Sequence, residues 1–208
     1  MKKLILLFTF LVTLTALKTK EELFTGKILY KYSFTDLQGN DINNKLIPYL
    51  GSEQHYFIDN KNYKTLNQDK LQQLYNSETN QYYYFTDTNA AQKIDGSKPT
   101  SQKFTITKLE TTEKIAGYAC KAIQIETDEA ITIYYFSPQI KTDKNVFAKH
   151  SFGEWNKYLE ATDGALALKY IMTNKKQGFI WTSTATEIAK LKLTAKDFSL
   201  PENVQVKE

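Results

Sequence analysis

The sequence predicts a mainly β protein, built on a strongly curved antiparallel sheet that forms a half-barrel or an open barrel, with little helix. About ten short segments rich in β-branched and aromatic residues follow one another, separated by clusters of turn-forming residues. Within such segments apolar side chains occupy every second position, as in residues 26–34, which is typical of a half-buried strand. Helical periodicity is scarce, and only residues 42–50 suggest one or two helical turns.

The segments between residues 55 and 86 and after residue 165 are expected to form hairpins. Asp59-Asn60-Lys61-Asn62 is a good turn sequence, because Asn and Asp tolerate turn conformations. Residues 70–75 fit a strand, although Leu71 and Leu74, three apart, also fit a helix. Residues 141–156 show the least pattern and are expected to form a loop over one end of the sheet. The other strands are expected at residues 55–58, 63–66, 81–86, 165–173 and 179–188.

Residues 103–138 are predicted to form a three-stranded antiparallel meander. The first turn is expected at Glu110–Glu113, and the third strand is expected to stop at Pro138, because proline cannot donate a hydrogen bond to a sheet. Gly117 is expected to adopt a turn or bulge conformation that a residue with a Cβ atom would resist. The three strands are expected at residues 104–109, 118–126 and 131–136.

Parts of this meander, and two later phrases, resemble a known family. The phrase KIAGYACKAI is followed by a strand that ends in Phe136-Ser137-Pro138-Gln139-Ile140, and later come Gly164-Ala165-Leu166-Ala167-Leu168 and Phe198-Ser199-Leu200-Pro201. Together they resemble the GLPGLI-type and DUF4412-type exported proteins of Bacteroidetes. The GLPGLI hexapeptide is absent, so the DUF4412-type resemblance is the better one. It implies a β-rich cell-envelope protein, similar in architecture to lipoprotein carriers with half-barrel folds, and it implies no active site.

Residues 1–17 have the features of a signal peptide. Met1-Lys2-Lys3 supplies the positive charge, and the apolar stretch from Leu4 to Leu14 is too short for a comfortable membrane span. We expect cleavage between Thr15 and Lys20, export to the periplasm or the outer membrane, and no stable membrane span afterwards; an uncleaved anchor is the alternative. Residues 20–208 are expected to form a single β-rich domain, since they are numerous enough for one core and no linker or repeat divides them.

Composition argues against several kinds of site. All 27 basic residues are lysine and they alternate with acids, so the planar fork of arginine is missing and nucleic acid is not an expected partner. Cys120 is the single cysteine, and no local sequence links it to His55 or His150 as a catalytic base. His55 and Asp59 would lie about 13 Å apart along a strand, too far to share a metal ion. No catalytic residue, metal ligand or cofactor is therefore predicted.

The aromatic residues are the main functional signal. The chain contains 14 Tyr, 12 Phe and 2 Trp, and clusters such as residues 82–85 and 134–136 place rings on both faces of a strand. Core packing explains one face; cross-strand ring pairs, a partner surface or a ligand groove explain the other. In the strand 131–136 we expect Ile131 and Ile133 on the tightly packed face. The candidate ligand-binding residues are Tyr82, Tyr84, Tyr134 and Phe136.

These observations favour a non-enzymatic binding or carrier-like protein. Its expected partner is a lipid, a lipidated envelope protein or a hydrophobic peptide, held in an apolar groove. The alternatives are an envelope hydrolase acting on glycan or peptide, through an acid pair or Cys120, and a glycan-binding module that uses Trp155 and Trp181. The sequence leaves the oligomeric state open.

Overall fold

The computed structural model describes residues 22–208. The predicted signal peptide, residues 1–17, lies outside the described residues. Among those described, no helix combines the length and apolar character needed to cross a membrane.

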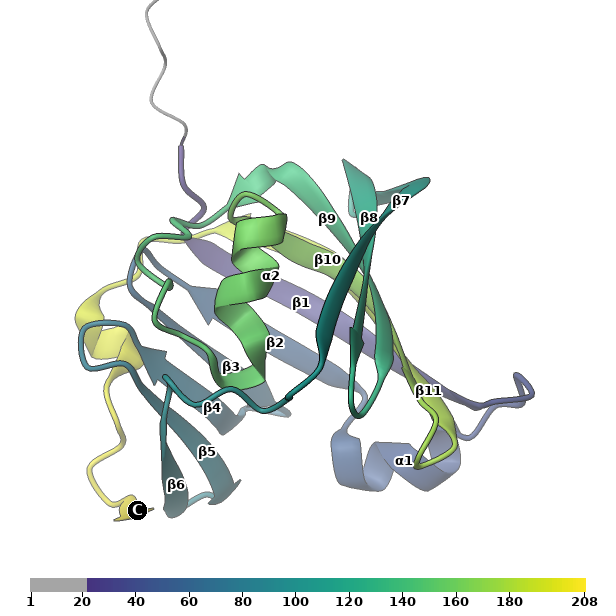
Figure 1. The fold of residues 1–208 in the computed structure, drawn as a ribbon. Helices are drawn as coiled ribbons and strands as arrows, with labels where there is room; N and C mark the ends of the chain where they lie inside the picture. Colours follow the sequence, from purple (N-terminus) through teal and green to yellow (C-terminus); the bar gives the residue numbers. More distant parts are fainter. Residues whose placement is uncertain (1–21) are drawn as a thin grey trace, which may run out of the picture.

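Twelve strands form one curved sheet in the order β12-β6-β5-β4-β3-β2-β1-β11-β10-β9-β8-β7 (Figure 1). Every neighbouring pair is antiparallel except β12 with β6. The sheet does not close, since β7 and β12 stand at opposite ends of this order. The predicted class, a curved open antiparallel sheet with little helix, is confirmed. The strands are β1 (Gly26–Asp36), β2 (Glu53–Ile58), β3 (Asn62–Asn67), β4 (Lys70–Asn76), β5 (Gln81–Asp87), β6 (Ala90–Asp95), β7 (Phe104–Ile115), β8 (Tyr118–Thr127), β9 (Ile131–Lys141), β10 (Ala165–Asn174), β11 (Phe179–Lys190) and β12 (Gln205–Lys207).

The connection between β9 and β10 covers the concave face of the sheet. It contains a 3₁₀ turn, η1 (Phe152–Glu154), and the helix α2 (Trp155–Ala161), which lies across the concave side (Figure 1). The loop predicted for residues 141–156 is therefore wrong in part, because the segment continues into a helix. Only Tyr158 and Leu159 of this short helix are buried, so its apolar pattern is too brief to show a helical period.

Buried tyrosines from three adjacent strands form much of the core beneath this connection. Tyr63 stands opposite Tyr75, and Tyr75 opposite Tyr82, so their rings follow one another across the sheet. His150 stacks on Tyr75 at 3.9 Å between ring centroids, and its Nε2 lies 2.7 Å from the Tyr63 hydroxyl. Burial lowers the pKa of His150 from 6.5 to about 3, so its imidazole is neutral at physiological pH.

A smaller apolar cluster involves the C-terminal segment. Phe198, at the end of the 3₁₀ turn η2 (Ala195–Phe198), packs with Leu74 and Phe85. Leu74 precedes Tyr75, so the two side chains lie on opposite faces of β4. The C-terminal segment therefore covers the face of the sheet opposite to α2.

Several local predictions are confirmed, two are wrong, and one strand was missed. The helical turns appear as α1 (Asn43–Leu50), and residues 70–76 are strand. No turn occurs at Glu110–Glu113, because a bulge between Leu109 and Thr112 lets β7 continue to Ile115. β9 runs through Pro138, where the third strand was expected to stop. Its pairing with β8 ends at Phe136, and its register with β10 shifts between Phe136 and Lys141. No regular ladder therefore needs the backbone N–H that proline lacks. β6 was not predicted.

The hairpin that joins β7 to β8 turns at Ala116 and Gly117. Their φ angles are +47° and +89°, the left-handed conformation that glycine adopts without strain. The expected special conformation of Gly117 is confirmed.

Candidate functional site

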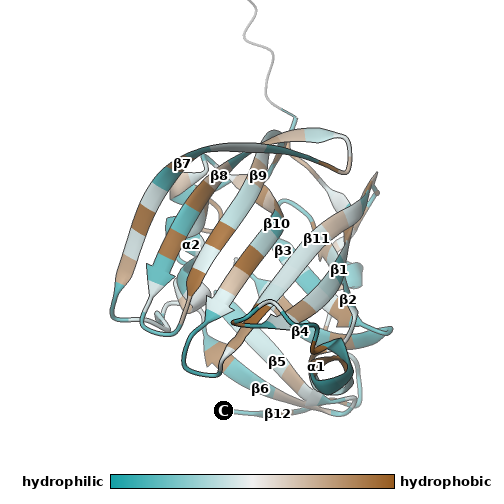
Figure 2. Cartoon of the chain, turned by 90° about the vertical axis from the view of Figure 1, so that its right-hand side faces the viewer, coloured by the Kyte–Doolittle hydropathy of each residue, from teal (hydrophilic) through white to brown (hydrophobic). Residues whose placement is uncertain are grey.

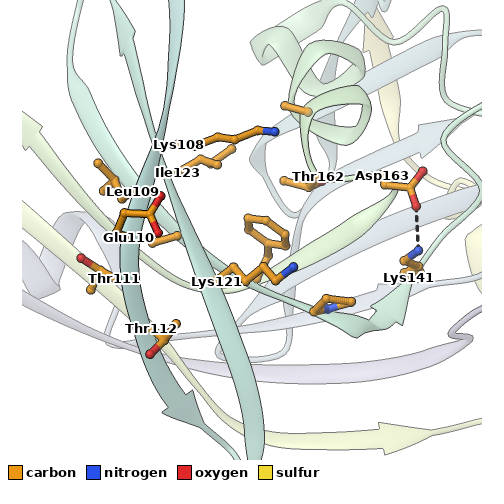
Figure 3. A pocket seen from close by; sticks show the side chains of 14 residues that line it. Lys108, Leu109, Glu110, Thr111, Thr112, Lys121, Ile123, Lys141, Thr162 and Asp163 are labelled. Carbon is orange, nitrogen blue, oxygen red and sulfur yellow. Dashed lines mark hydrogen bonds and ion pairs between the residues drawn. The ribbon is translucent and has the colours of Figure 1, made fainter.

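A pocket of about 530 Å³ lies between the β7–β8 hairpin and the C-terminal end of α2 (Figure 3). One wall is the hairpin, the floor is β9, and the other wall is the turn from α2 into β10. A second pocket, of about 500 Å³, lies along β7 and α2, and Ala161 lines both. We call the two together the groove. Its lining residues include Phe104, Ile106, Lys108, Leu109, Glu110, Lys121, Ile123, Phe136, Lys141, Lys144, Lys157, Glu160, Ala161, Thr162 and Asp163.

Strand register places an apolar surface on the inner side of the first pocket. Ile123 stands opposite Lys108 on β7 and opposite Tyr134 on β9. Lys121 stands opposite Phe136, two residues along the same strands, so Ile123 and Phe136 share one face of the sheet. That face looks toward α2, because the ring of Tyr134 lies 5.0 Å from that of Tyr158. The apolar surface therefore faces the helix end rather than the outside of the barrel.

The bulge in β7 shapes the hairpin wall. Glu110 and Thr111 fall between the paired residues Leu109 and Thr112, and extra residues of this kind bend a strand and increase its twist. Beyond the bulge the hairpin crosses over the neighbouring strands (Figure 2). Apolar and polar residues alternate along these strands. The carboxylate of Glu113 accepts hydrogen bonds of 2.9 Å at both oxygens from Lys169 of β10. This partly buried ion pair holds the bent end of the hairpin.

The opposite wall is fixed by hydrogen bonds around the end of α2. The Thr162 hydroxyl lies 3.0 Å from the carbonyl oxygens of both Tyr158 and Ala165. Gly164 has a φ of +79°, and a Cβ atom there would lie 2.4 Å from the carbonyl oxygen of Thr142. Only glycine fits this close approach, so the turn from helix to strand is rigidly placed.

Ion pairs hold the acidic residues at this wall. Lys141 donates to Asp163 at 2.8 Å, and Lys144 lies 3.3 Å from the same carboxylate and 3.4 Å from Glu160. The hydrogen bonds from Lys141 and Lys144 lower the pKa of Asp163 below its usual range. Lys157 lies 4.8 Å from the centroid of the Phe104 ring. Within residues 22–208, Lys108 and Lys121 have no hydrogen bond, ion pair or ring contact.

The four residues expected to bind a ligand lie in different places. Phe136 is 8% exposed and lines the groove. Tyr134 faces α2, and burial raises its pKa to about 12, so it stays neutral. Tyr82 is buried against Phe152 at 4.7 Å, and Tyr84 is 44% exposed at a position that lines neither pocket of the groove. Ligand binding by these residues stays a prediction, with Phe136 the best placed.

The expectation for the two faces of β9 needs a correction. Tyr134 lies on the concave face, as expected, and Phe136 lines the groove. However, Ile131 and Ile133 are only half-buried, whereas Thr132 and Phe136 are buried. The reason is α2, which covers the concave face and makes it the more tightly packed one.

Sequence reasoning missed most of the groove. Register across β7, β8 and β9 places Ile123, Lys108 and Lys121 at the groove. Ala161 lines the groove because α2 ends there. Alternation along β8 places Ile123 and Lys121 on one face, which is a usable signal. The bulge that sets the position of Lys108 has no comparable signal in the sequence.

Other residues with possible chemistry lie apart. Cys120 is 2% exposed, burial raises the pKa of its thiol, and no hydrogen bond joins it to His55 or His150. Asp59 accepts backbone hydrogen bonds within its own turn. Trp155 stacks on Tyr158 at 5.3 Å. Residues 22–208 contain no cluster of three metal-ligating side chains.

Comparison with known proteins gives a family and distant structural relatives. A family model described as a domain of unknown function, DUF4412, matches residues 58–204. No curated protein matches the sequence. The structure of PNGF-II in space group P21 is 16% identical, with a TM-score of 0.53, and the match covers 88% of this chain and 32% of that one. The chain thus spans about a third of the length of PNGF-II, and the likeness shows the fold alone.

Two proteins shorter than PNGF-II match with lower TM-scores. The LolA superfamily protein NE2245 from Nitrosomonas europaea is 9% identical, with a TM-score of 0.37, over 85% of this chain and 90% of that one. A putative outer membrane lipoprotein-sorting protein domain from Vibrio parahaemolyticus is 12% identical, with a TM-score of 0.33, over 83% of this chain and 89% of that one.

Proposed function

Because the chain belongs to the DUF4412 family, whose description assigns no function, we propose from its geometry that it is a binding or carrier protein for an aliphatic chain. The ligand is the acyl chain of a lipid or of a lipidated protein, and it lies in the groove. The protein acts in the cell envelope, to which the signal-peptide features of residues 1–17 direct it.

The observation that carries the proposal is the apolar surface of the groove. Ile123 and Phe136 are diagonal neighbours on one face of adjacent strands, and Leu109 lines the same pocket. Phe104 and Ile106 continue the apolar lining along β7, and Ile106 is 37% exposed. A volume of about 530 Å³ lies in the usual range for a small-molecule site. An elongated apolar ligand would cover the exposed Ile106 and the half-buried Phe104 and Leu109.

Side-chain contacts fix both walls of the groove, as expected for a preformed binding site. The ion pair between Glu113 and Lys169 holds the hairpin, and the Thr162 hydrogen bonds hold the helix end. A preformed site loses less conformational entropy when it binds than a site that must first become ordered.

The test is to fill the groove without removing core side chains. Ala161 lines both pockets and is only half-buried at the last position of α2, so Ala161→Trp adds bulk where there is space. Ala195→Trp, at an exposed position in η2, is the matched control. Dansylated undecanoic acid is the probe, and its fluorescence reports entry into an apolar site.

We expect wild type and Ala195→Trp to bind the probe, and Ala161→Trp to bind it at least about tenfold more weakly with an unchanged melting temperature. Native mass spectrometry of gently extracted mature protein should also show an apolar passenger in wild type. Failure of wild type to bind the probe, or equal binding by Ala161→Trp, would refute the proposal.

A further inference from the structure

Two lysines at the groove have no partner among the described residues, although every other lysine that lines it does. Lys141 and Lys144 pair with Asp163, and Lys157 lies over the Phe104 ring. Lys108 and Lys121 make no such contact within residues 22–208, and both side chains are exposed. In Figure 3 both extend from the hairpin toward the end of α2, on the same side as Ile123.

Register places these two lysines near each other on one face of the hairpin. Lys108 stands opposite Ile123, and Lys121 lies two residues before Ile123 on β8. Diagonal neighbours of this kind have Cα atoms roughly 7–8 Å apart in an antiparallel pair. Two like charges thus flank an apolar side chain at the edge of the first pocket, and their repulsion is relieved when an anion lies between them.

The helix end does not account for these charges. Lysines often lie near the C-terminus of a helix, where carbonyl groups lack partners. Here the carbonyl oxygens of Tyr158, Leu159 and Glu160 already accept hydrogen bonds from the N–H groups of residues 162, 164 and 163, at 3.0, 2.7 and 3.4 Å. Lys108 and Lys121 are therefore available to a ligand.

From this placement we infer that the groove selects anionic single-chain amphiphiles. The aliphatic chain lies on Ile123 and Phe136, and a carboxylate or phosphate group at its end accepts hydrogen bonds from Lys108 and Lys121. The inference rests on the proposed function, since it names the head group of the ligand that the groove holds. Charge-assisted hydrogen bonds to two ammonium groups would distinguish this head group from neutral and cationic ones.

Competition against dansylated undecanoic acid tests the inference. The competitors share a dodecyl or dodecanoyl chain and differ in the head group: dodecanoate, dodecyl phosphate, dodecyl maltoside and dodecyltrimethylammonium, each below its micelle concentration. Inorganic phosphate alone is the arm that detects a simple anion site. The variants are Lys108→Gln/Lys121→Gln and a control, Lys45→Gln/Lys70→Gln, which removes the same charge from exposed lysines outside the groove.

We expect dodecanoate and dodecyl phosphate to compete at least about tenfold better than the maltoside with wild type, and inorganic phosphate to compete poorly. The Lys108→Gln/Lys121→Gln protein should lose this preference but still bind the maltoside as wild type does, and the control should keep it. Equal competition by all head groups, or equal loss in the control, would overturn the inference and leave the proposed function standing. Competition by inorganic phosphate as effective as that by dodecyl phosphate would also overturn the inference, because it would indicate a simple anion site. Absence of binding by every amphiphile would refute both.

Discussion

Replacing His150 with phenylalanine is expected to weaken the dependence of stability on pH below 6.5. His150 is fully buried, its ring stacks on Tyr75, and Nε2 lies 2.7 Å from the Tyr63 hydroxyl. Burial lowers its pKa from 6.5 to about 3. Because the pKa is lower in the native state, the unfolded chain takes up the proton first, so stability present above pH 6.5 is lost as the pH falls toward 3.

The magnitude follows from the two pKa values. At pH 5 an unfolded chain with a histidine pKa of 6.5 is almost fully protonated, whereas the native imidazole with a pKa of about 3 is neutral. The difference amounts to about 2 kcal/mol of unfolding free energy at pH 5 relative to pH 8. His150→Phe keeps a ring on Tyr75 but leaves the Tyr63 hydroxyl without its partner, a cost of about 1–3 kcal/mol that does not change over this pH range.

Urea unfolding at pH 8, 6.5 and 5 measures this effect. Wild type should lose about 2 kcal/mol more than His150→Phe between pH 8 and pH 5, because all other titrating groups are shared. His55→Gln is the matched control, since it removes the other histidine, whose ring is partly exposed beside Glu53. Parallel pH profiles for wild type and His150→Phe would show that His150 is accessible to protons in the native state.

Three further outcomes are expected. Gly117→Val should lower the unfolding free energy by more than about 1 kcal/mol, because Gly117 has a φ of +89°; an unchanged melting temperature would contradict this. Glu154→Gln should lower it by about 1–3 kcal/mol, measured by urea unfolding, because the buried carboxylate accepts three hydrogen bonds from Thr100 and Ser101 at 2.7–2.9 Å; an unchanged urea midpoint would refute that role. Phe136→Ala should weaken binding of dansylated undecanoic acid at least about tenfold whereas Tyr84→Ala should not, and the reverse order would place the ligand elsewhere.

Local chemistry explains what the sequence predicted correctly. Hairpins such as β2–β3 depend on turn residues and on alternation within a few positions, and both can be recognised in a single sequence. Gly117 was identified in the same way. The curved open sheet then followed from the number of short strands and the scarcity of helix.

The remaining features depend on long-range contacts. The helix α2 forms where Tyr158 and Leu159 pack onto the concave face, and seven residues with two buried side chains give no clear period. β9 passes through Pro138 only because its neighbours leave that position outside a regular ladder. Tyr134 and Ile123 stand opposite each other in register, but the sequence gives no pairing partner for either. The groove was therefore predicted as a kind of site, and only Phe136 among its lining residues was named.

Contact between an acyl chain and the apolar lining of the groove tests the central claim most directly. In protein with labelled isoleucine and leucine methyl groups, bound dodecanoate should give intermolecular nuclear Overhauser effects to Ile123 and Leu109, which line the first pocket. Ile58, fully buried on β2, should give none. Effects to Ile123 that disappear in Ala161→Trp would support an acyl-chain groove, and a bound ligand that contacts neither Ile123 nor Leu109 would contradict it.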